Sequence, residues 1–184
     1  RYVVATSGAV AFMTVISAGD PSRLRIDEVT TVASAYAMAQ FLTDGRISGK
    51  ALPLSVAAGL LNKIASAGDG TVSKVLQASP NADETNARRE VATLANILAG
   101  CAREAQRCQP LFDLTDDGRR PATTLEAITS IARHPARNVK PIFALGEEIQ
   151  PFQPALLAIH GPDAPDPFLR LDAYYQEMIK GVII

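Results

Sequence analysis

The stretch Asp27–Leu42, DEVTTVASAYAMAQFL, decides the fold that this sequence predicts. After Glu28 it carries no charge for fourteen residues, and small residues fill most gaps between the larger ones. Val29, Val32 and Tyr36 follow helical spacing, and the opposite side of such a helix is apolar too. A helix that is apolar all round is normally buried by neighbours on several sides. We therefore expect a central, buried helix here.

The start of this helix is also marked. Asp27 can supply the capping oxygen, and Glu28 adds negative charge at the positive end of the helix dipole. The predicted fold class is mainly α: an irregular bundle of about five helices around the buried central helix, with a small β element formed by the terminal segments.

Size and composition limit the other possibilities. The 184 residues suffice for one domain, or one domain plus a fragment of another. Hydrophobic residues make up 47%, too many for a disordered chain. Lys and Arg number 18 against 19 acidic residues, and aromatic residues are 5%. Because nucleic-acid binding needs a clustered basic surface, no nucleic-acid partner is expected.

The N-terminal segment, residues 1–22, is predicted to be β-rich and could be the end of a preceding domain. Tyr2–Gly19 carries no charge, so a signal-peptide core or a membrane span is the alternative. Polar and flexible positions interrupt the apolar run, and the Ser7-Gly8 pair divides it into two β-branched stretches. We favour two strands and expect no membrane span. The missing initiator methionine suggests a processed or truncated chain.

Residues 23–158 are predicted to form the helical domain. Asn81 with Glu84, and Thr123 with Glu126, match the reciprocal capping pattern. The segment before the second helix is predicted as a loop, residues 45–53. The further helices are expected at about residues 54–66, 72–76, 81–102, from 123 to the His134-Pro135 pair, and 138–145.

Two burial patterns accompany these helices. In the helix near residues 54–66, the stripe expected to face the core is Val56, Leu60, Leu61 and Ile64. In the helix near residues 81–102, the core face is expected at Val91, Leu94, Ala95 and Leu98, with Arg88, Arg89 and Glu90 in solvent.

The C-terminal segment, residues 159–184, is predicted to be an extended, proline-rich tail. Pro162, Pro165 and Pro167 interrupt it. Phe168–Tyr174 alternates apolar and polar residues and is a candidate strand.

Cys101 and Cys108 are the two cysteines. On an unbroken helix their separation gives about 10.5 Å of rise, beyond the roughly 7 Å limit for bridged Cα atoms. A disulfide therefore requires the helix to end between them, which Gly100 and Gln109-Pro110 make reasonable. Two reduced thiols are the alternative. Zinc needs more ligands than two cysteines supply, so no metal site is expected.

No catalytic motif is visible. His134 lies at a predicted helix end, where a cation suits the helix dipole, and Glu147-Glu148 are adjacent acids whose side chains diverge. No phosphate loop, nucleophile elbow or zinc-protease motif occurs, and no cofactor is expected. If a pocket exists between the helices, Tyr36, His134 and Glu148 are its candidate polar contacts.

Four phrases suggest a family resemblance. They are IDEVTTVASAYAMAQFL, ETNARREVATLANILAGCAREAQRCQPLF, TTLEAITSIARHPARNVKPIFAL and PFQPAL, in this order over residues 24–157. They resemble a helical module of secreted bacterial proteins, often found upstream of NHL-repeat or gluconolactonase-like β-propellers. The resemblance implies export and a paired Cys101 and Cys108. It carries no catalytic residue, and no propeller repeats follow in this sequence.

These observations lead to two functional hypotheses. The favoured one is a non-catalytic, secreted structural or interaction module, extracellular or in the cell envelope. It would pack against another domain of the same polypeptide, a protein partner in a homo- or hetero-oligomer, or a surface ligand. The alternative is an enzyme or small-molecule-binding domain with a pocket between helices.

Overall fold

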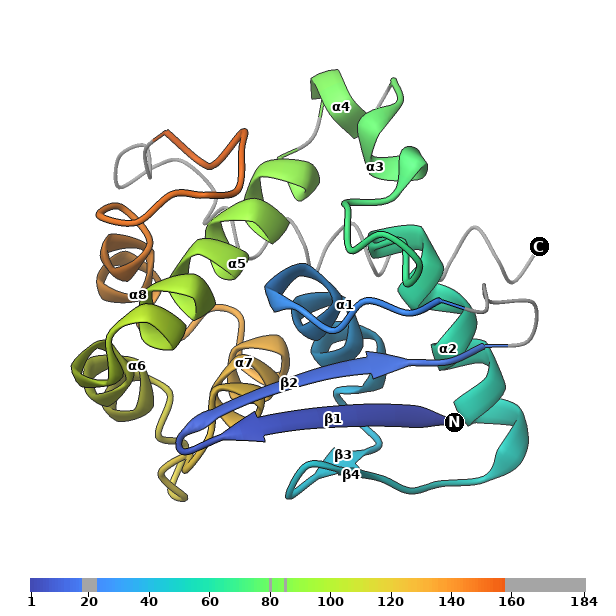
Figure 1. Ribbon diagram of the computed structural model, residues 1–184, viewed down its shortest axis with the longest axis horizontal. Coiled ribbons are helices and arrows are strands. Elements are labelled where there is room, and N and C mark those ends of the chain that lie inside the picture. The colour runs from blue at the N-terminus through green and yellow to red at the C-terminus, as the bar shows by residue number, and fades with distance from the viewer. Residues whose placement is uncertain (18–22, 80, 85, 158–184) are drawn as a thin grey trace.

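The computed structural model of the chain describes residues 1–17, 23–79, 81–84 and 86–157. It is mainly helical, as expected from the sequence, with two small two-stranded sheets (Figure 1). One sheet lies in the predicted N-terminal β element, and the other, within residues 42–47, was not predicted. Helix α1, Glu28–Met38, lies at the centre. It packs against helices α2 (Ala51–Ile64), α5 (Ala87–Arg103) and α7 (Thr124–Arg133) and against strand β2 (Val10–Val15), so the prediction of a buried central helix is confirmed.

Helix α1 begins with a complete capping box. The Asp27 carboxylate accepts the N–H of Thr30 at 2.9 Å, and the Thr30 hydroxyl accepts the N–H of Asp27 at 3.0 Å. Every residue of the helix except Glu28 and Tyr36 is buried. Residues on all sides of it are therefore covered, which fits a helix without a polar face.

The helix ends four residues earlier than its apolar run suggests. Leu42–Thr43 forms strand β3, which pairs with β4, Arg46–Ile47. Asp44 and Gly45 join the two strands with φ angles of 52° and 70°. Positive φ at both central residues suits the twist of a tight hairpin, and Asp-Gly is a preferred pair for it.

The remaining helices of the described chain follow in order. They are α2 (Ala51–Ile64), α3 (Lys74–Gln77), α4 (Asn81–Glu84), α5 (Ala87–Arg103), the 3₁₀ turn η1 (Ala105–Arg107), α6 (Cys108–Leu114), α7 (Thr124–Arg133) and α8 (Val139–Leu145).

Two helix boundaries correct the sequence prediction. Helix α2 starts at Ala51, inside the expected loop, because Pro53 occupies its first turn, where no N–H bond is lost. The single helix expected from Asn81 is divided into α4 and α5. The capping prediction at Thr123 is confirmed, since its hydroxyl accepts the N–H of Glu126 at 3.3 Å.

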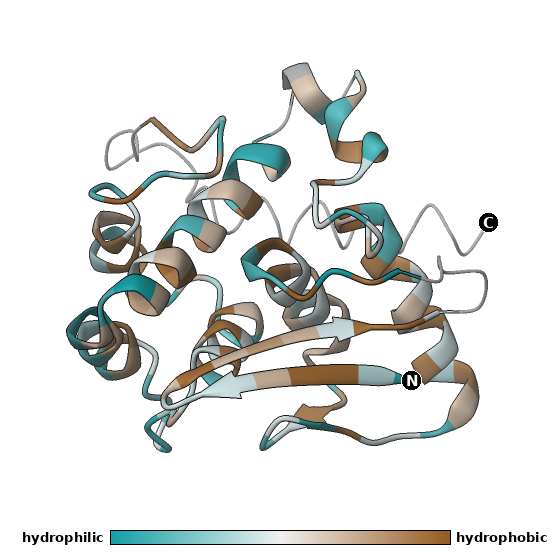
Figure 2. Cartoon of the chain, in the orientation of Figure 1, coloured by the Kyte–Doolittle hydropathy of each residue, from teal (hydrophilic) through white to brown (hydrophobic). Residues whose placement is uncertain are grey.

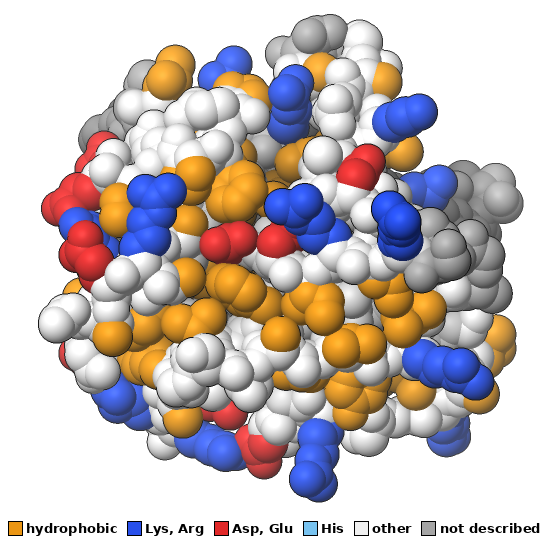
Figure 3. All heavy atoms as spheres, in the orientation of Figure 1, with side chains coloured by type: hydrophobic (Ala, Val, Ile, Leu, Met, Phe, Trp, Pro, Cys, Tyr) orange, Lys and Arg blue, Asp and Glu red, His pale blue; other side chains and the backbone are white. Residues whose placement is uncertain are grey.

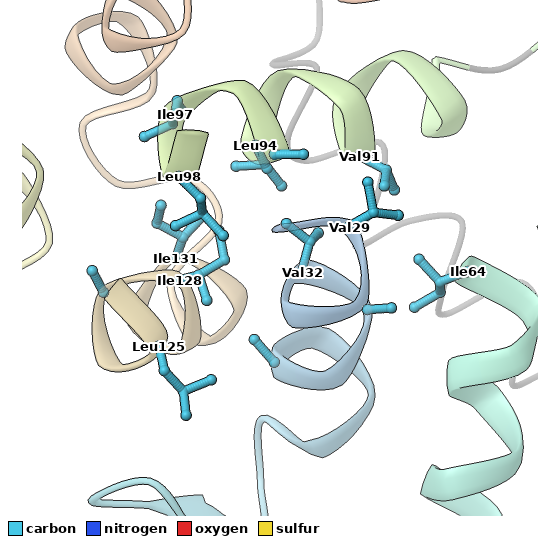
Figure 4. Close-up of a cluster of buried hydrophobic side chains, with 14 of the residues drawn as sticks. Val29, Val32, Ile64, Val91, Leu94, Ile97, Leu98, Leu125, Ile128 and Ile131 are labelled. Atoms are coloured by element: carbon cyan, nitrogen blue, oxygen red, sulfur yellow. The ribbon is translucent and has the colours of Figure 1, made fainter. Parts of the chain in front are cut away.

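The core is formed where α1 meets its neighbours. Figure 4 shows Val29 and Val32 of α1, Val91 and Leu94 of α5, Ile128 and Ile131 of α7, and Ile64 of α2 gathered in one cluster. Leu94, Leu98 and Ile128 are fully buried. Small residues of α1 allow these larger side chains to approach its backbone closely.

The expectation that Glu90 lies in solvent is wrong, because its side chain is 1% exposed. Helix α5 is covered on a second side by the segment at residues 151–157. There Asn96 exchanges two hydrogen bonds with the Phe152 backbone, and the Leu156 N–H bonds the Thr93 hydroxyl at 2.9 Å. Glu90 shares the helix face of Thr93, three residues on, and is buried with it.

The predicted pair of N-terminal strands is confirmed. Strand β1, Tyr2–Ser7, pairs antiparallel with β2, Val10–Val15, across a turn in which Gly8 has a φ of 58°. Ala11, Met13 and Val15 belong to the same core as the helices. The hairpin, expected as a separate β-rich segment, therefore shares its core with the helical part.

The predicted tail, residues 159–184, and its candidate strand Phe168–Tyr174 lie outside the described residues. Within the described ranges, no helix combines the length and the apolar character needed to cross a membrane.

Candidate interaction surface

One edge of the β1–β2 hairpin is closed by helix side chains. The Thr124 hydroxyl accepts the N–H of Ala11 at 2.9 Å and donates to its carbonyl oxygen at 2.8 Å. The Thr31 hydroxyl accepts the N–H of Met13 at 3.0 Å, and the Ser34 hydroxyl donates to the Met13 carbonyl at 3.2 Å. The three hydroxyls thus replace a neighbouring strand for β2.

The helices place these hydroxyls accurately. Thr31 and Ser34 are one turn apart on α1, and Thr124 is the first residue of α7. All three side chains are completely buried. A buried N–H or C=O without a partner costs about 1–3 kcal/mol, so these contacts decide whether β2 can lie in the core.

The other edge of the hairpin belongs to β1. The Ile16 N–H bonds the Arg1 carbonyl at 2.7 Å, and the Arg1 N-terminus bonds the Ile16 carbonyl at 3.4 Å. This rung is therefore a hydrogen-bonded pair, and such pairs alternate along antiparallel strands. With the observed register, the N–H and C=O groups of Tyr2, Val4 and Thr6 point away from β2.

No other strand among residues 1–157 that the structure describes pairs with this second edge. Each residue of β1 except Val4 is exposed, with Tyr2 38% and Val3 40% accessible. The sheet has two strands in the described chain. The strand YVVATS contains no charged residue and no proline, the two devices that commonly protect a sheet edge from pairing. Figure 2 shows the apolar residues in the middle of β1.

Helix α2 carries an exposed apolar stripe. Leu52 is 76% exposed and Val56 is 55% exposed, whereas Ala57, Leu61 and Ile64 of the same helix are buried. The expectation that Val56 faces the core is therefore wrong. Helix α2 has apolar residues on two sides, and periodicity alone does not identify the side that the core covers.

Helix α2 is hydrogen-bonded to the hairpin at the end opposite the Gly8 turn. The Asn62 amide donates to the Ser17 hydroxyl at 2.8 Å, next to the Arg1–Ile16 rung. Figure 3 shows apolar side chains gathered across the face on which the hairpin lies. We define the candidate interaction surface as strand β1 with the exposed stripe Leu52 and Val56.

The three candidate pocket residues lie in different surroundings. Tyr36 is partly buried on α1 and packs against the core. His134 follows α7, and its Nε2 lies 3.4 Å from the Asp117 carboxylate. Glu148 follows α8 and forms an ion pair with Arg107.

One of these residues lines a hollow that the structure describes. Glu148 borders a hollow with Arg107 between α5, α6 and α8. A second hollow, between the β3–β4 turn and α7, is lined by Asp44, Arg119 and Arg133 but not by Tyr36 or His134. The three candidates therefore do not converge in either place.

The second hollow is lined with charges that are already paired. Arg119 contacts Asp44 at 2.6 Å, and Arg133 donates to the Ala39 carbonyl at 2.8 Å and to the Leu42 carbonyl. Arg133 joins α7 to the end of α1 and to β3, and Arg119 joins the segment before α7 to the β3–β4 turn. The arrangement explains the position of the turn without a ligand.

The cysteines occupy the junction of α5 and α6. Helix α5 ends at Arg103, and η1 reverses the chain so that the Cα atoms of Cys101 and Cys108 lie 4.8 Å apart, with their sulfur atoms at bonding distance. Both side chains are buried. The helix ends between the cysteines, as a disulfide requires.

Three charged groups have shifted pKa values. Burial raises the pKa of the Glu28 carboxyl above its ordinary value of 4.5. Hydrogen bonds from the Thr71 hydroxyl and N–H lower the pKa of Asp69 below 3.8. The Glu148 carboxylate raises the pKa of Arg107. The three groups lie on different parts of the chain, so the shifts do not identify a shared catalytic site.

Comparison of the chain with family models, curated proteins and solved structures gives no match. The described residues contain no group of three or more His, Cys, Asp or Glu side chains arranged to hold a metal ion.

Proposed function

We propose that this chain is a non-catalytic structural or interaction module that packs against another domain, a subunit or a surface ligand through the candidate interaction surface. The observation that carries the proposal is the open edge of β1. Its outward backbone groups have no partner among the described residues, and the strand is uncharged. Helix α2, which bonds the hairpin through Asn62 and Ser17, adds exposed apolar side chains.

Strand edges of this kind bind proteins in a known way. An extended segment adds to the edge, its main chain supplies the hydrogen bonds, and alternate side chains supply specificity. Leu52 and Val56 add apolar surface that loses contact with water on docking. The helical core behind the hairpin holds the strand in place, since β2 is fixed to α1 and α7.

The module is proposed to be exported, in the extracellular space or the cell envelope. The sulfur atoms of Cys101 and Cys108 at bonding distance support this, because disulfides persist in oxidising compartments. The resemblance of the four phrases to secreted bacterial modules is a second support. A thiol count on freshly isolated protein, denatured without reductant, should find no free thiol; two free thiols would contradict export.

Docking is tested on the protein isolated from the cells that make it. Native mass spectrometry should detect an assembly larger than the 19.5 kDa chain. The double variant Leu52→Glu/Val56→Glu should weaken this assembly at least about tenfold, since it places two charges in an apolar contact.

Ala102→Glu is the matched control for that variant. Ala102 is exposed on α5 and does not belong to the candidate interaction surface, and this substitution also replaces an apolar side chain by a carboxylate. The control should leave the assembly intact. A strictly solitary chain, or equal loss in both variants, would contradict the proposed function.

The enzyme or small-molecule-binding alternative needs Tyr36, His134 and Glu148 to act together in one pocket. The separate surroundings of these residues give it less support than the exposed surface gives to docking.

A further inference from the structure

We propose that the partner at the β1 edge is a second copy of this chain, which pairs β1 with β1 antiparallel around a two-fold axis at Val4. This inference rests on the proposed function and specifies its partner. The result would be a four-stranded sheet in the order β2-β1-β1-β2, with the helices of each copy behind its own hairpin.

The hydrogen-bonding pattern of the edge is self-complementary. The outward groups belong to Tyr2, Val4 and Thr6, which are symmetric about Val4. An antiparallel copy can therefore place Val4 opposite Val4 and Tyr2 opposite Thr6. Each of these three pairs exchanges two N–H···O bonds, so that the outward N–H and C=O groups of all three residues find partners.

The charges permit this arrangement. Strands β1 and β2 contain no charged residue, so no like charges face each other along the new rungs. The nearest charged side chain along the sequence is Arg1, which this register places opposite Ser7 of the other copy. A two-fold interface uses the same patch on both subunits, and this patch meets that condition without repulsion.

The side chains between the hydrogen-bonded rungs also fit. Val3 would lie opposite Ala5 of the second copy, a large residue against a small one, and both residues are exposed. The pair occurs twice, once on each side of the two-fold axis, because each copy supplies Val3 to one pair and Ala5 to the other. The apolar outer faces of the two hairpins would then form one continuous surface.

The size of the contact sets the expected affinity. A six-residue strand edge is small against the roughly 1,200 Å² of a standard stable interface. We therefore expect a reversible dimer with a Kd of about 1–100 μM, in the range of transient complexes.

Sedimentation velocity on the full chain tests the dimer. Between about 1 and 300 μM, the weight-average mass should rise from 19.5 kDa toward twice that value. Thr6→Pro and Tyr2→Pro each remove an outward N–H, and each should weaken dimerisation at least tenfold while keeping the monomer's circular dichroism spectrum. Ala102→Glu should dimerise like the wild type.

Cysteine cross-linking tests the register. Val3 and Ala5 of different copies would form a narrow pair, with Cα atoms about 4.5 Å apart, close enough for a disulfide. Val3 and Val3 would be about 8 Å apart, one strand spacing across and two residues along. An equal mixture of Val3→Cys and Ala5→Cys should therefore cross-link on mild oxidation, at least tenfold more than either variant alone.

A chain that stays monomeric at 300 μM would overturn the proposal, and so would equal cross-linking in the mixture and in the single variants. These failures can be separated from failure of the proposed function. If a different chain binds and Thr6→Pro prevents its binding, the edge is a docking site but the second copy is not its partner. If nothing binds in either experiment, both proposals fail.

Discussion

The two edges of the β1–β2 hairpin have the same backbone chemistry and opposite surroundings. On the β2 edge, Thr31, Ser34 and Thr124 satisfy the N–H and C=O groups of Ala11 and Met13. On the β1 edge, the corresponding groups of Tyr2, Val4 and Thr6 have no partner in the part of the chain that the structure describes. The difference shows that a hairpin can be fixed in a helical core by side-chain hydroxyls while its other edge stays available for pairing.

The largest difference between the two edges is expected when proline replaces one residue of a cross-strand pair. Thr6 and Ala11 are direct cross-strand partners, but their N–H groups point to opposite edges. Ala11→Pro removes the donor to Thr124 inside the core and should lower the free energy of unfolding by about 4 kcal/mol. Thr6→Pro should lower it by less than about 1 kcal/mol, since proline is tolerated where an edge N–H faces solvent.

Urea denaturation of the two variants, measured at a concentration below that of self-association, compares these losses. Equal losses would mean that the two edges do not differ.

The second prediction concerns the hydroxyl at position 124. Thr124→Val keeps the shape of the side chain but leaves the N–H and C=O of Ala11 without partners, and should cost about 3 kcal/mol of stability. Thr124→Ser keeps the hydroxyl and should cost about 1 kcal/mol, for the lost methyl group. Chemical denaturation measures both values. If the serine variant is as unstable as the valine variant, the hydrogen bonds of the hydroxyl to Ala11 do not stabilise the β2 edge.

The third prediction is for the cysteine pair, which lies at the α5–α6 junction. If the disulfide is formed, it closes a loop of about eight residues, and replacing both cysteines by alanine should lower stability by about 2.5 kcal/mol. The same variant should dimerise like the wild type, because the junction contributes no residue to the β1 edge. A double alanine variant that unfolds at the same urea concentration as the oxidised protein would contradict this expectation.

The smallest effect is expected at the start of α1, the helix that supplies Thr31 and Ser34. Since burial raises the pKa of Glu28 in the folded state, the folded protein binds a proton more readily than the unfolded chain. Its contribution to stability is therefore highest in acid and falls as pH rises from about 4.5 through the folded pKa.

Glu28→Gln removes this dependence. Relative to the wild type, the variant should be more stable at pH 7 than at pH 4. A wild type that gains stability over the variant as the pH rises would show that the sign is wrong.

The sequence was sufficient for the features that local chemistry determines. The uncharged run after Glu28, the Asp27 cap, the turn at Gly8 and the Thr123 cap all depend on residues a few positions apart, and the structure has them. The end of α5 between the two cysteines was inferred in the same way.

Features that depend on distant residues were missed. The exposed side of α2 is decided by its packing on α1 and α3. The burial of Glu90 is decided by the distant segment 151–157, in which Phe152 bonds Asn96. The hydrogen bonding of the β2 edge depends on the Thr124 hydroxyl, which lies 113 positions along the chain from its partner Ala11. In the sequence pattern the small polar residues of α1 fill the gaps between larger ones. In the structure Thr31 and Ser34 also form hydrogen bonds with the Met13 backbone in β2. A regular spacing of hydroxyl residues on an uncharged helix is the one signal that could have indicated this.

Amide hydrogen exchange, followed residue by residue in dilute protein, tests the difference between the edges most directly. The account predicts that the amides of Ala11 and Met13 exchange only on global unfolding, while those of Val4 and Thr6 exchange rapidly and become protected as the concentration rises. Rapid exchange at Ala11 and Met13, or strong protection at Val4 and Thr6 in dilute monomer, would contradict it.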